Sequence, residues 1–327
     1  MPMKRISCVF LMLSFILLLV GCTSDESVSI TSEQSLEASV SGNISEASEK
    51  TEEESTEVSL DPTVNSTKKI TSLDYKNNGK MGDNDGPAFA VYSQKGYNGA
   101  SVVVDIANSE IKTKLPDGRF VNGYMFLGAD VFNGSYWMNC FDAGLCWSGV
   151  DGGWHIFYNV YETVNESTPS WYESGKKLPK NGKYVITLKF IADERAQLTV
   201  EGVNNGFKDS VKIEIKGAKK DGSNTAMLFN VALDYPPNTK VDKDGNPSED
   251  WAVITLANSD KGLYLKELHA TDLKLFKNDV EEPWTDKKNS SLGLWPDKSV
   301  EGFDYSPAEV YLFDGTEYFI NLDMNRK

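Results

Sequence analysis

The eight residues SVKIEIKG at positions 210–217 decide the fold class of this chain. Val211, Ile213 and Ile215 alternate with charged residues. Because successive side chains of a strand point to opposite faces, this pattern predicts a strand with one buried and one solvated face. Helical periodicity is nearly absent from residue 72 onward. The segment is therefore typical of an antiparallel sheet that covers a core with one face.

Comparable apolar or alternating runs continue on both sides of this segment. Turn residues that tolerate positive φ separate them, as tight hairpins require. These turns are Asn204-Asn205-Gly206, Asp221-Gly222, Asp244-Gly245 and Asp314-Gly315. Further strands are expected at residues 100–106, 123–132, 154–161, 183–191, 196–203, 225–233, 251–257, 263–276, 308–313 and 318–323. About a dozen such strands predict two packed antiparallel sheets, so we expect one all-β sandwich domain over residues 71–327.

Two passages within this domain resemble parts of a known group of sandwiches. They are GGWHIFYN at residues 152–159 and the late strand at residues 262–276. Both are similar to segments of concanavalin A-like and laminin G-like domains, which implies a jelly-roll arrangement of the two sheets. That group includes lectins, hydrolases and lyases, so the resemblance implies architecture and leaves the activity open.

The first 22 residues have the parts of a bacterial export signal. A basic start is followed by an apolar run at residues 6–20, which is shorter than the ~20 residues of a membrane-spanning helix. The motif LVGC at residues 19–22 resembles the lipobox of bacterial lipoproteins. The resemblance implies that residues 1–21 are removed, that Cys22 becomes the lipidated N-terminus, and that two acyl chains such as palmitate hold the protein at the extracellular face of the cell membrane.

The segment after the lipobox has the composition of a linker. Residues 23–70 are rich in Ser, Thr and Glu, contain no aromatic residue and carry eleven acids against three lysines. Such a segment cannot bury enough apolar surface to offset its ordering entropy. We therefore expect residues 22–70 to be a lipidated cysteine followed by a disordered stalk.

The acidic charge of the chain bears on its partners. The formal net charge is -15, and no basic stripe with interleaved aromatic residues is present. An acidic domain repels phosphate backbones, so nucleic acid is not an expected partner. Contact with the membrane is expected through the N-terminal lipid only.

Two cysteines, Cys140 and Cys146, remain for the domain once the signal is removed and Cys22 is lipidated. An exported location permits a disulfide. On one straight strand the two residues would lie ~20 Å apart, so pairing requires the chain to reverse at residues 142–144. A disulfide and two buried free thiols are therefore open alternatives.

Polar and aromatic residues are densest between residues 133 and 159. Sugars stack on aromatic rings and form hydrogen bonds with Asp and Asn, so the segment predicts a site for a polysaccharide or glycan. The alternative is that the rings form core, which fits Trp154 because Ile156 and Tyr158 follow it in alternation. We expect Trp137 and Trp147 to be the exposed rings. The predicted ligand-binding residues are Tyr136, Trp137, Asn139, Asp142, Trp147 and, in a separate loop, Trp171.

A metal site is a weaker prediction. Asp242, Asp244 and Asn246 place oxygen atoms at alternate positions, and such donors suit a hard cation such as calcium. The segment departs from an EF-hand loop in its glycine position and lacks the closing glutamate. A polar hairpin turn explains the same residues.

The chain has few residues from which a histidine-dependent catalytic or zinc site could be built, since His155 and His269 are its two histidines. Glycoside hydrolysis needs two carboxylates about 5–10 Å apart, and Asp142 with Glu162 or Glu173 is the pair to test. We therefore expect a non-enzymatic lipoprotein with a carbohydrate-binding sandwich. The alternatives are a glycan-cleaving enzyme of sandwich fold and a structural or adhesive lipoprotein that binds protein or wall polymer.

Overall fold

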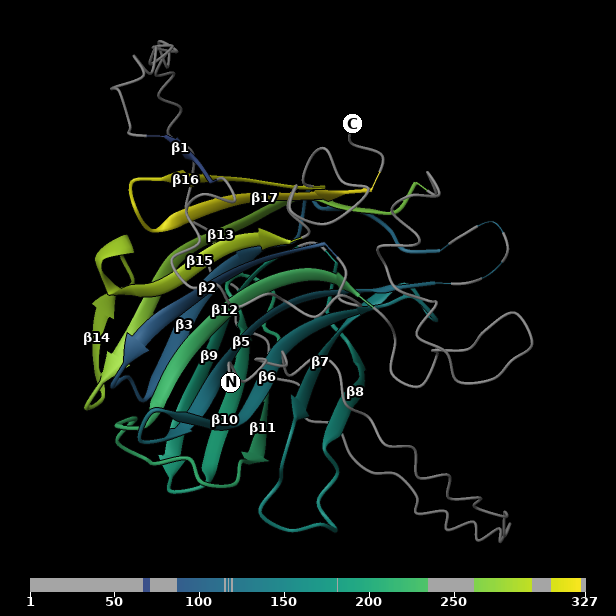
Figure 1. Cartoon of the computed structure of the whole chain (residues 1–327). Coiled ribbons are helices and arrows are strands. Elements are labelled where there is room, and N and C mark those ends of the chain that lie inside the picture. Colours follow the sequence, from purple (N-terminus) through teal and green to yellow (C-terminus); the bar gives the residue numbers. More distant parts are fainter. Residues whose placement is uncertain are drawn as a thin grey trace, which may run out of the picture. The chain divides into compact units, whose positions relative to one another are not determined.

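The structure is a computed structural model that describes residues 67–70, 87–114, 116, 118, 120–180, 182–234, 262–295 and 307–324. All of these residues belong to one compact unit. They form a sandwich of two antiparallel sheets, which confirms the predicted fold class (Figure 1). Within these ranges, no helix is long and apolar enough to cross a membrane. The predicted lipidation at Cys22, the strand at 251–257 and the metal ligands Asp242, Asp244 and Asn246 lie outside the described residues.

The larger sheet, sheet A, has ten strands. Its main path follows β1 (Lys68–Lys69), β16 (Ala308–Phe313), β17 (Glu317–Asp323), β13 (Tyr264–Lys277), β3 (Gly99–Asp105), β9 (Lys183–Ala192), β10 (Arg195–Gly202) and β11 (Lys208–Glu214). Two short strands, β4 (Glu110–Lys112) and β14 (Val280–Pro283), also pair with β13. The 3-10 helix η2 (Asp286–Lys288) follows β14 and leads into the other sheet.

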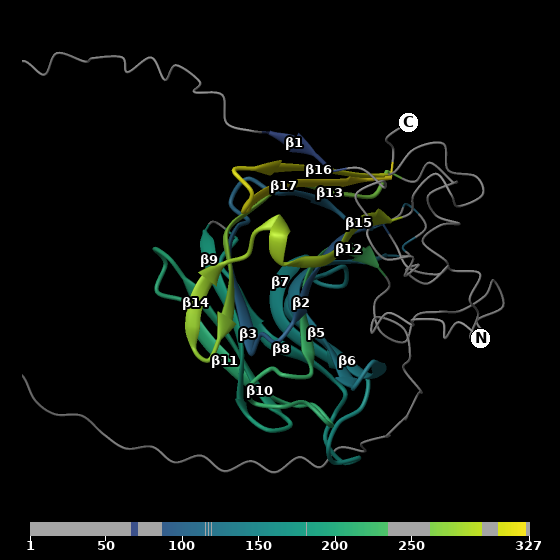
Figure 2. The same ribbon diagram turned by 60° about the vertical axis from the view of Figure 1, so that its left-hand side comes forward.

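Sheet B has seven strands. In spatial order they are β15 (Asn289–Trp295), β2 (Ala88–Lys95), β12 (Thr225–Asp234), β5 (Asn122–Asn133), β6 (Tyr136–Ser148), β7 (Gly153–Val160) and β8 (Trp171–Lys177). Figure 1 shows β12, β5, β6, β7 and β8 side by side. The turned view of Figure 2 separates β9, β10 and β11 of sheet A from β5 and β6 of sheet B.

The main core lies between the two sheets and takes side chains from both. Strand β11 behaves as its sequence predicts: Ile213 is fully buried in this core, Val211 packs against it, and Lys212 is exposed. Each fully buried Ile, Val, Leu or Phe side chain contributes about 1.5–3 kcal/mol relative to an exposed one. The alternation along the strands therefore supplies most of the stability that holds the sheets together.

Strand β6 does not reverse at residues 142–144, as a disulfide between Cys140 and Cys146 would require. It runs without interruption from Tyr136 to Ser148 and pairs with β5 on one side and β7 on the other. A chain held by two ladders cannot turn back on itself, so Cys140 and Cys146 stay about 20 Å apart along the strand. Cys146 is a free, buried cysteine. Of the two open alternatives, a disulfide between Cys140 and Cys146 is therefore excluded.

Sheet A also begins earlier in the sequence than predicted. Lys69 pairs with Tyr311 in β16, and the amide of Ile70 donates to the carbonyl oxygen of Val310 at 2.9 Å. The Ile70 side chain is 1% exposed and belongs to the main core. The predicted linker up to residue 70 is therefore too long at its end, because Ile70, which follows two lysines, extends the sheet edge.

Candidate functional site

The face of sheet B that points away from sheet A carries a second apolar cluster. We call it the outer face. Antiparallel sheets in sandwiches usually bury one face and solvate the other. Strand β12 departs from this rule, because all ten of its residues are buried. The outer-face cluster consists of Ala88, Ala90, Tyr124, Phe126, Cys146, Phe157, Leu228, Ala232 and Trp295, with Tyr92 and Trp171 packed against it.

The strand register aligns one row of side chains across the outer face. Each residue of this row is the direct partner of the next on the neighbouring strand, so their side chains share the face. Strands lie ~4.8 Å apart, so the row is roughly 24 Å long. In spatial order, the row consists of Tyr92, Leu228, Gly128, Asp142, Asn159 and Trp171. We call it the Tyr92–Trp171 row.

The row combines aromatic ends with a polar middle. Tyr92 and Trp171 are partly exposed, as is Asn159, while Asp142 is 3% exposed. A Cβ atom at Gly128 would lie 3.1 Å from Asp142 Oδ1 and closer still to the carbonyl oxygen of Phe141. The carboxylate of Asp142 therefore lies over Gly128, and a larger residue there would displace it.

Packed aromatic rings support the Trp171 end of the row. The Trp171 and Phe157 rings lie 5.5 Å apart at an interplanar angle of 34°. Phe157 in turn makes an edge contact with Phe126, at 5.8 Å and 89°. Such offset and edge-on pairs are worth about 0.5–1.5 kcal/mol beyond their buried area. The Trp171 ring is therefore held in place rather than loosely attached to the edge strand.

Asn230 in β12 is the least expected residue of the outer face. It pairs with Ala90 on one side and Phe126 on the other, and it is 2% exposed. Its Oδ1 atom has no hydrogen-bond partner. A buried acceptor without a donor costs about 1–3 kcal/mol. This oxygen is therefore available to a hydrogen-bond donor that comes from outside the described residues.

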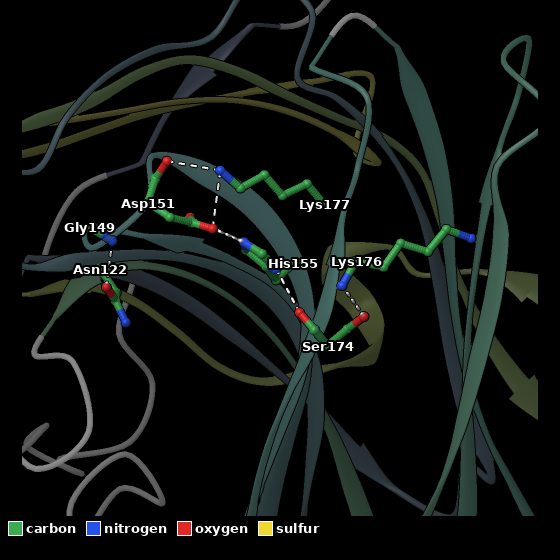
Figure 3. A network of polar contacts seen from close by, with 7 residues as sticks. All are labelled: Asn122, Gly149, Asp151, His155, Ser174, Lys176 and Lys177. Atoms are coloured by element: carbon green, nitrogen blue, oxygen red, sulfur yellow. Dashed lines mark hydrogen bonds and ion pairs between the residues drawn. The ribbon is translucent and has the colours of Figure 1, made fainter. Parts of the chain in front are cut away.

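A polar network closes the other end of the same face (Figure 3). His155 Nδ1 lies 2.7 Å from the carbonyl oxygen of Ser174, and His155 Nε2 lies 3.2 Å from both carboxylate oxygens of Asp151. Lys177 Nζ donates to the backbone oxygen of Asp151 at 2.9 Å and lies 3.1 Å from its carboxylate. A neutral imidazole has one N–H, so only the imidazolium satisfies both acceptors at once. This network ties the β6–β7 turn to β8.

Burial controls the titratable groups near this network. Burial raises the pKa of Glu173, the neighbouring Asp151 adds to this effect, and His155 opposes it. Burial also raises the pKa of the Cys146 thiol well above its usual range, so the group is a thiol and a poor nucleophile. Desolvation is the largest single influence on Asp151 and raises its pKa, but the hydrogen bonds and charges of Lys177 and His155 together outweigh it and leave this pKa lowered.

The structure brings together three of the six predicted ligand residues. Asp142 and Trp171 share the Tyr92–Trp171 row. Trp137 lies beyond Asp142 on β6, and its Nε1 donates to Asp130 Oδ1 at 3.1 Å. Tyr136 stands apart at the β5–β6 turn and is 69% exposed.

The other two predicted residues point away from the outer face. Asn139 is 1% exposed, and its Nδ2 donates to the backbone oxygens of Glu162 at 2.7 Å and Lys216 at 3.0 Å. Trp147 packs against the main core and makes an edge contact with Trp154 at 5.8 Å. From Asn139 onward, the odd positions of β6 point into the sandwich and the even ones, such as Asp142, point outward. Trp137 precedes the register shift between Val131 and Phe132, so this rule does not apply to it. Neither Trp137 nor Trp147 is fully exposed, since both are partly buried.

Further predictions about this region can be compared with the structure. Trp154, with Ile156 and Tyr158, belongs to the main core as expected. The Glu162 carboxylate forms an ion pair with Lys216 at 2.8 Å, so it is not directed at Asp142. Within the described residues, no group of three or more His, Cys, Asp or Glu side chains is placed to hold a metal ion.

Sequence reasoning missed Tyr92, Asn159 and Asn230. One signal was present in the sequence: Asn230 interrupts an otherwise apolar strand of ten residues, and a lone amide in such a run marks a buried polar group. Tyr92 and Asn159 could not be placed without the strand order.

Comparisons with known proteins show likeness in fold only. No family model and no curated protein matches this chain. A solved structure of scytalido-glutamic peptidase with a peptide-based transition state analog has a TM-score of 0.45 and 10% identity, and covers 72% of this chain and 97% of its own. A structure described as an endo-acting O-glycanase that initiates mucin breakdown has a TM-score of 0.30 and 11% identity, and covers 56% of this chain and 85% of its own. At such low identity, a likeness concerns architecture and not activity.

Proposed function

We propose that this chain is a lipid-anchored surface protein whose sandwich captures a polysaccharide or glycan along the Tyr92–Trp171 row. The observation that carries the proposal is one register of side chains with aromatic rings at both ends and Asp142 and Asn159 between them. Sugar rings stack their C–H faces on indole and phenol, and their hydroxyls pair with carboxylate and amide groups. The six residues of the row include no lysine or arginine, which favours a neutral ligand.

The exposure and rigidity of Trp171 support this proposal. Its ring is partly exposed and is backed by Phe157, so it offers a fixed surface with area left for a ligand. A fixed ring loses little conformational entropy on binding. A row of roughly 24 Å suits an extended chain better than a single sugar.

The anchor is proposed from the sequence alone. Lipidation at Cys22 would keep the protein on the outer side of the cell membrane, at the end of a stalk. Cys22→Ser should move the protein from the membrane fraction to the medium, and incorporation of labelled palmitate should be lost with it. An unchanged membrane fraction in Cys22→Ser would contradict the anchor without affecting the ligand site.

The first test of the ligand site is a glycan-array screen followed by titration of any bound glycan. Trp171→Ala should weaken binding about tenfold or more, which corresponds to about 1.4 kcal/mol. The matched control is Tyr172→Ala, because Tyr172 is the next residue of β8 and stacks on Tyr158, at 5.4 Å and 18°, away from the outer face. Equal losses in both variants, or no binding to any glycan, would overturn the proposed site.

Cleavage of the bound glycan is a second candidate function. Asp130 pairs with Cys140, so Asp142 is its diagonal neighbour on the outer face. Diagonal neighbours have α-carbons about 7–8 Å apart, which permits the carboxyl spacing of a glycosidase. Release of new reducing ends by the wild type, abolished in Asp142→Asn, would favour this candidate over capture.

A further inference from the structure

A pair of aromatic side chains lies beside the Tyr92–Trp171 row without belonging to it. The rings of Trp137 and Tyr161 lie 5.2 Å apart at an interplanar angle of 59°. Both side chains are partly exposed. We call this pair the Trp137–Tyr161 platform. Partly exposed rings that are held in place are surfaces on which sugars stack, so the pair is a candidate for a second contact with the ligand.

A β-bulge directs Trp137 to the outer face. Val131 pairs with Asn139, whereas the next residue of β5 pairs with Trp137, so Met138 is the extra residue of β6. The Met138 side chain packs against the main core. Regular alternation would have placed Trp137 on the inward side together with Asn139. Bulges are frequent next to functional sites, where they re-aim a side chain.

Two hydrogen bonds fix the platform in this position. Trp137 Nε1 donates to Asp130 Oδ1 at 3.1 Å, which holds the indole over the outer face. The amide of Tyr161 donates to the carbonyl oxygen of Cys140 at 3.0 Å, which extends the pairing of β7 with β6 by one residue. Val160 belongs to the main core, so the next side chain, that of Tyr161, points outward. A ring that is fixed before binding loses little conformational entropy when a ligand stacks on it.

The platform lies to one side of the middle of the row. Asp130 follows Gly128 of the row by two residues of β5, and Tyr161 follows Asn159 of the row by two residues. Two residues of a strand span roughly 7 Å, so the platform is displaced from the row along the strand direction. A chain that follows the row from one end to the other therefore passes beside the platform without covering it.

The platform offers a ring face and a hydroxyl to a ligand. The indole N–H of Trp137 is already bonded to Asp130, so its ring face is the part that a ligand can use. The Tyr161 hydroxyl forms no hydrogen bond with any described residue, so it can pair with a sugar hydroxyl. Neither platform residue is charged, which favours a neutral sugar, as the row does.

We propose that the Trp137–Tyr161 platform binds a side branch of the glycan whose main chain lies along the Tyr92–Trp171 row. The ligand is therefore a branched polysaccharide with neutral branches. This inference rests on the proposed capture function and deepens it, because the row alone does not distinguish a branched glycan from a linear one.

Titration calorimetry of the full-length protein with matched oligosaccharides tests this inference. The two members of each pair share a main chain and differ in the branches that it carries. The pairs are xyloglucan with cello-oligosaccharides, galactomannan with manno-oligosaccharides, and arabinoxylan with xylo-oligosaccharides. In at least one pair the branched member should bind about fivefold more tightly or more, which is the contribution of one stacked ring.

Trp137→Ala and Trp171→Ala separate the platform from the row. Trp137→Ala should reduce binding of the branched member to the level of the linear member. It should leave binding of the linear member unchanged, which also shows that the outer face is still folded. Trp171→Ala should weaken binding of both members. The matched control is Tyr136→Ala, because Tyr136 is the neighbouring aromatic residue, is 69% exposed and stands apart from the platform, so both affinities should equal those of the wild type.

Two results would overturn the inference and leave capture along the row intact. One is that no branched member binds more tightly than its linear partner. The other is that Trp137→Ala weakens both members equally, because the platform would then lie on the path of the main chain. The inference is also overturned if none of these oligosaccharides binds, and the glycan array then decides separately whether the row binds a glycan.

Discussion

The Asn139 side chain joins separate backbone segments through hydrogen bonds and is not a ligand residue. Its Oδ1 accepts from the amides of Cys140 at 2.8 Å and Glu162 at 2.9 Å, in addition to the two bonds donated by its Nδ2. Asn139→Ala leaves buried backbone groups without partners, so we expect a loss of about 2–4 kcal/mol in the free energy of unfolding, measured with urea. Asn133→Ala, at the exposed end of β5, should be neutral. Loss of glycan binding in Asn139→Ala with unchanged stability would contradict this role.

Glu173, in β8, should make the stability of the protein depend on pH. Burial raises the pKa of its carboxyl in the folded state. The folded protein therefore binds the proton of the Glu173 carboxyl more tightly than the unfolded chain does. The stability that this protonated carboxyl contributes is present at low pH and is lost as pH rises through its folded pKa. Glu173→Gln should raise the melting temperature at pH 7 relative to the wild type, and this gain should vanish near pH 4.

Melting curves from pH 4 to pH 8 check this expectation. Glu166→Gln is the control, because Glu166 is exposed and its substitution should give no such pH-dependent gain. A loss of stability at pH 7 in Glu173→Gln would show instead that the ionised carboxylate makes a favourable contact in the folded state.

At the scale of the element, the close approach of β5 and β6 depends on Gly144. A Cβ atom there would lie 2.5 Å from Phe126 Cα and 2.6 Å from the carbonyl oxygen of Met125. These are backbone atoms of a paired strand and cannot move without breaking the ladder. Gly144→Ala should therefore cost about 1–3 kcal/mol of stability in urea unfolding.

Gly175 in β8 provides the matched control for this substitution. A Cβ atom there would have no neighbour within 4 Å, so Gly175→Ala should be neutral or stabilise the protein slightly by restricting the unfolded chain. Similar effects of the two substitutions would mean that β5 and β6 can separate locally and that the outer face is less rigid than inferred.

Local patterning predicted the alternating strands and also the continuously apolar β5 and β12, but it missed β6 and β8. Strand β11 was found from its alternating isoleucines, and β9 and β10 from similar runs. Strand β8 has one buried residue, Ser174, and neither β8 nor β6 was among the expected strands. An edge strand and a strand buried on both faces lack the period-two signal, so their ends depend on tertiary pairing.

At the scale of the molecule, the candidate site depends on strand order. Asp142 and Trp171 were predicted separately, but only the order β6, β7, β8 places them in one row with Asn159 between them. Trp147 has an aromatic ring of the kind that stacks on sugars. It occupies a position of β6 whose side chain points into the core and not toward the outer face. A shift of one residue reverses the face of a side chain, and sequence alone does not fix that register.

The extent of the folded unit is testable through Ile70, which the predicted stalk had included. Its buried side chain fixes β1 to the edge of sheet A, next to the ion pair of Lys69 Nζ with Glu309 at 2.7 Å. Ile70→Ala in the full-length protein should therefore lower the free energy of unfolding by about 2–5 kcal/mol, because it removes core contacts and leaves a cavity. Val150→Ala, at a side chain that is 72% exposed, is the control and should change little. An unaltered unfolding midpoint in Ile70→Ala would mean that the sheet edge is β16 and that the stalk continues to residue 70.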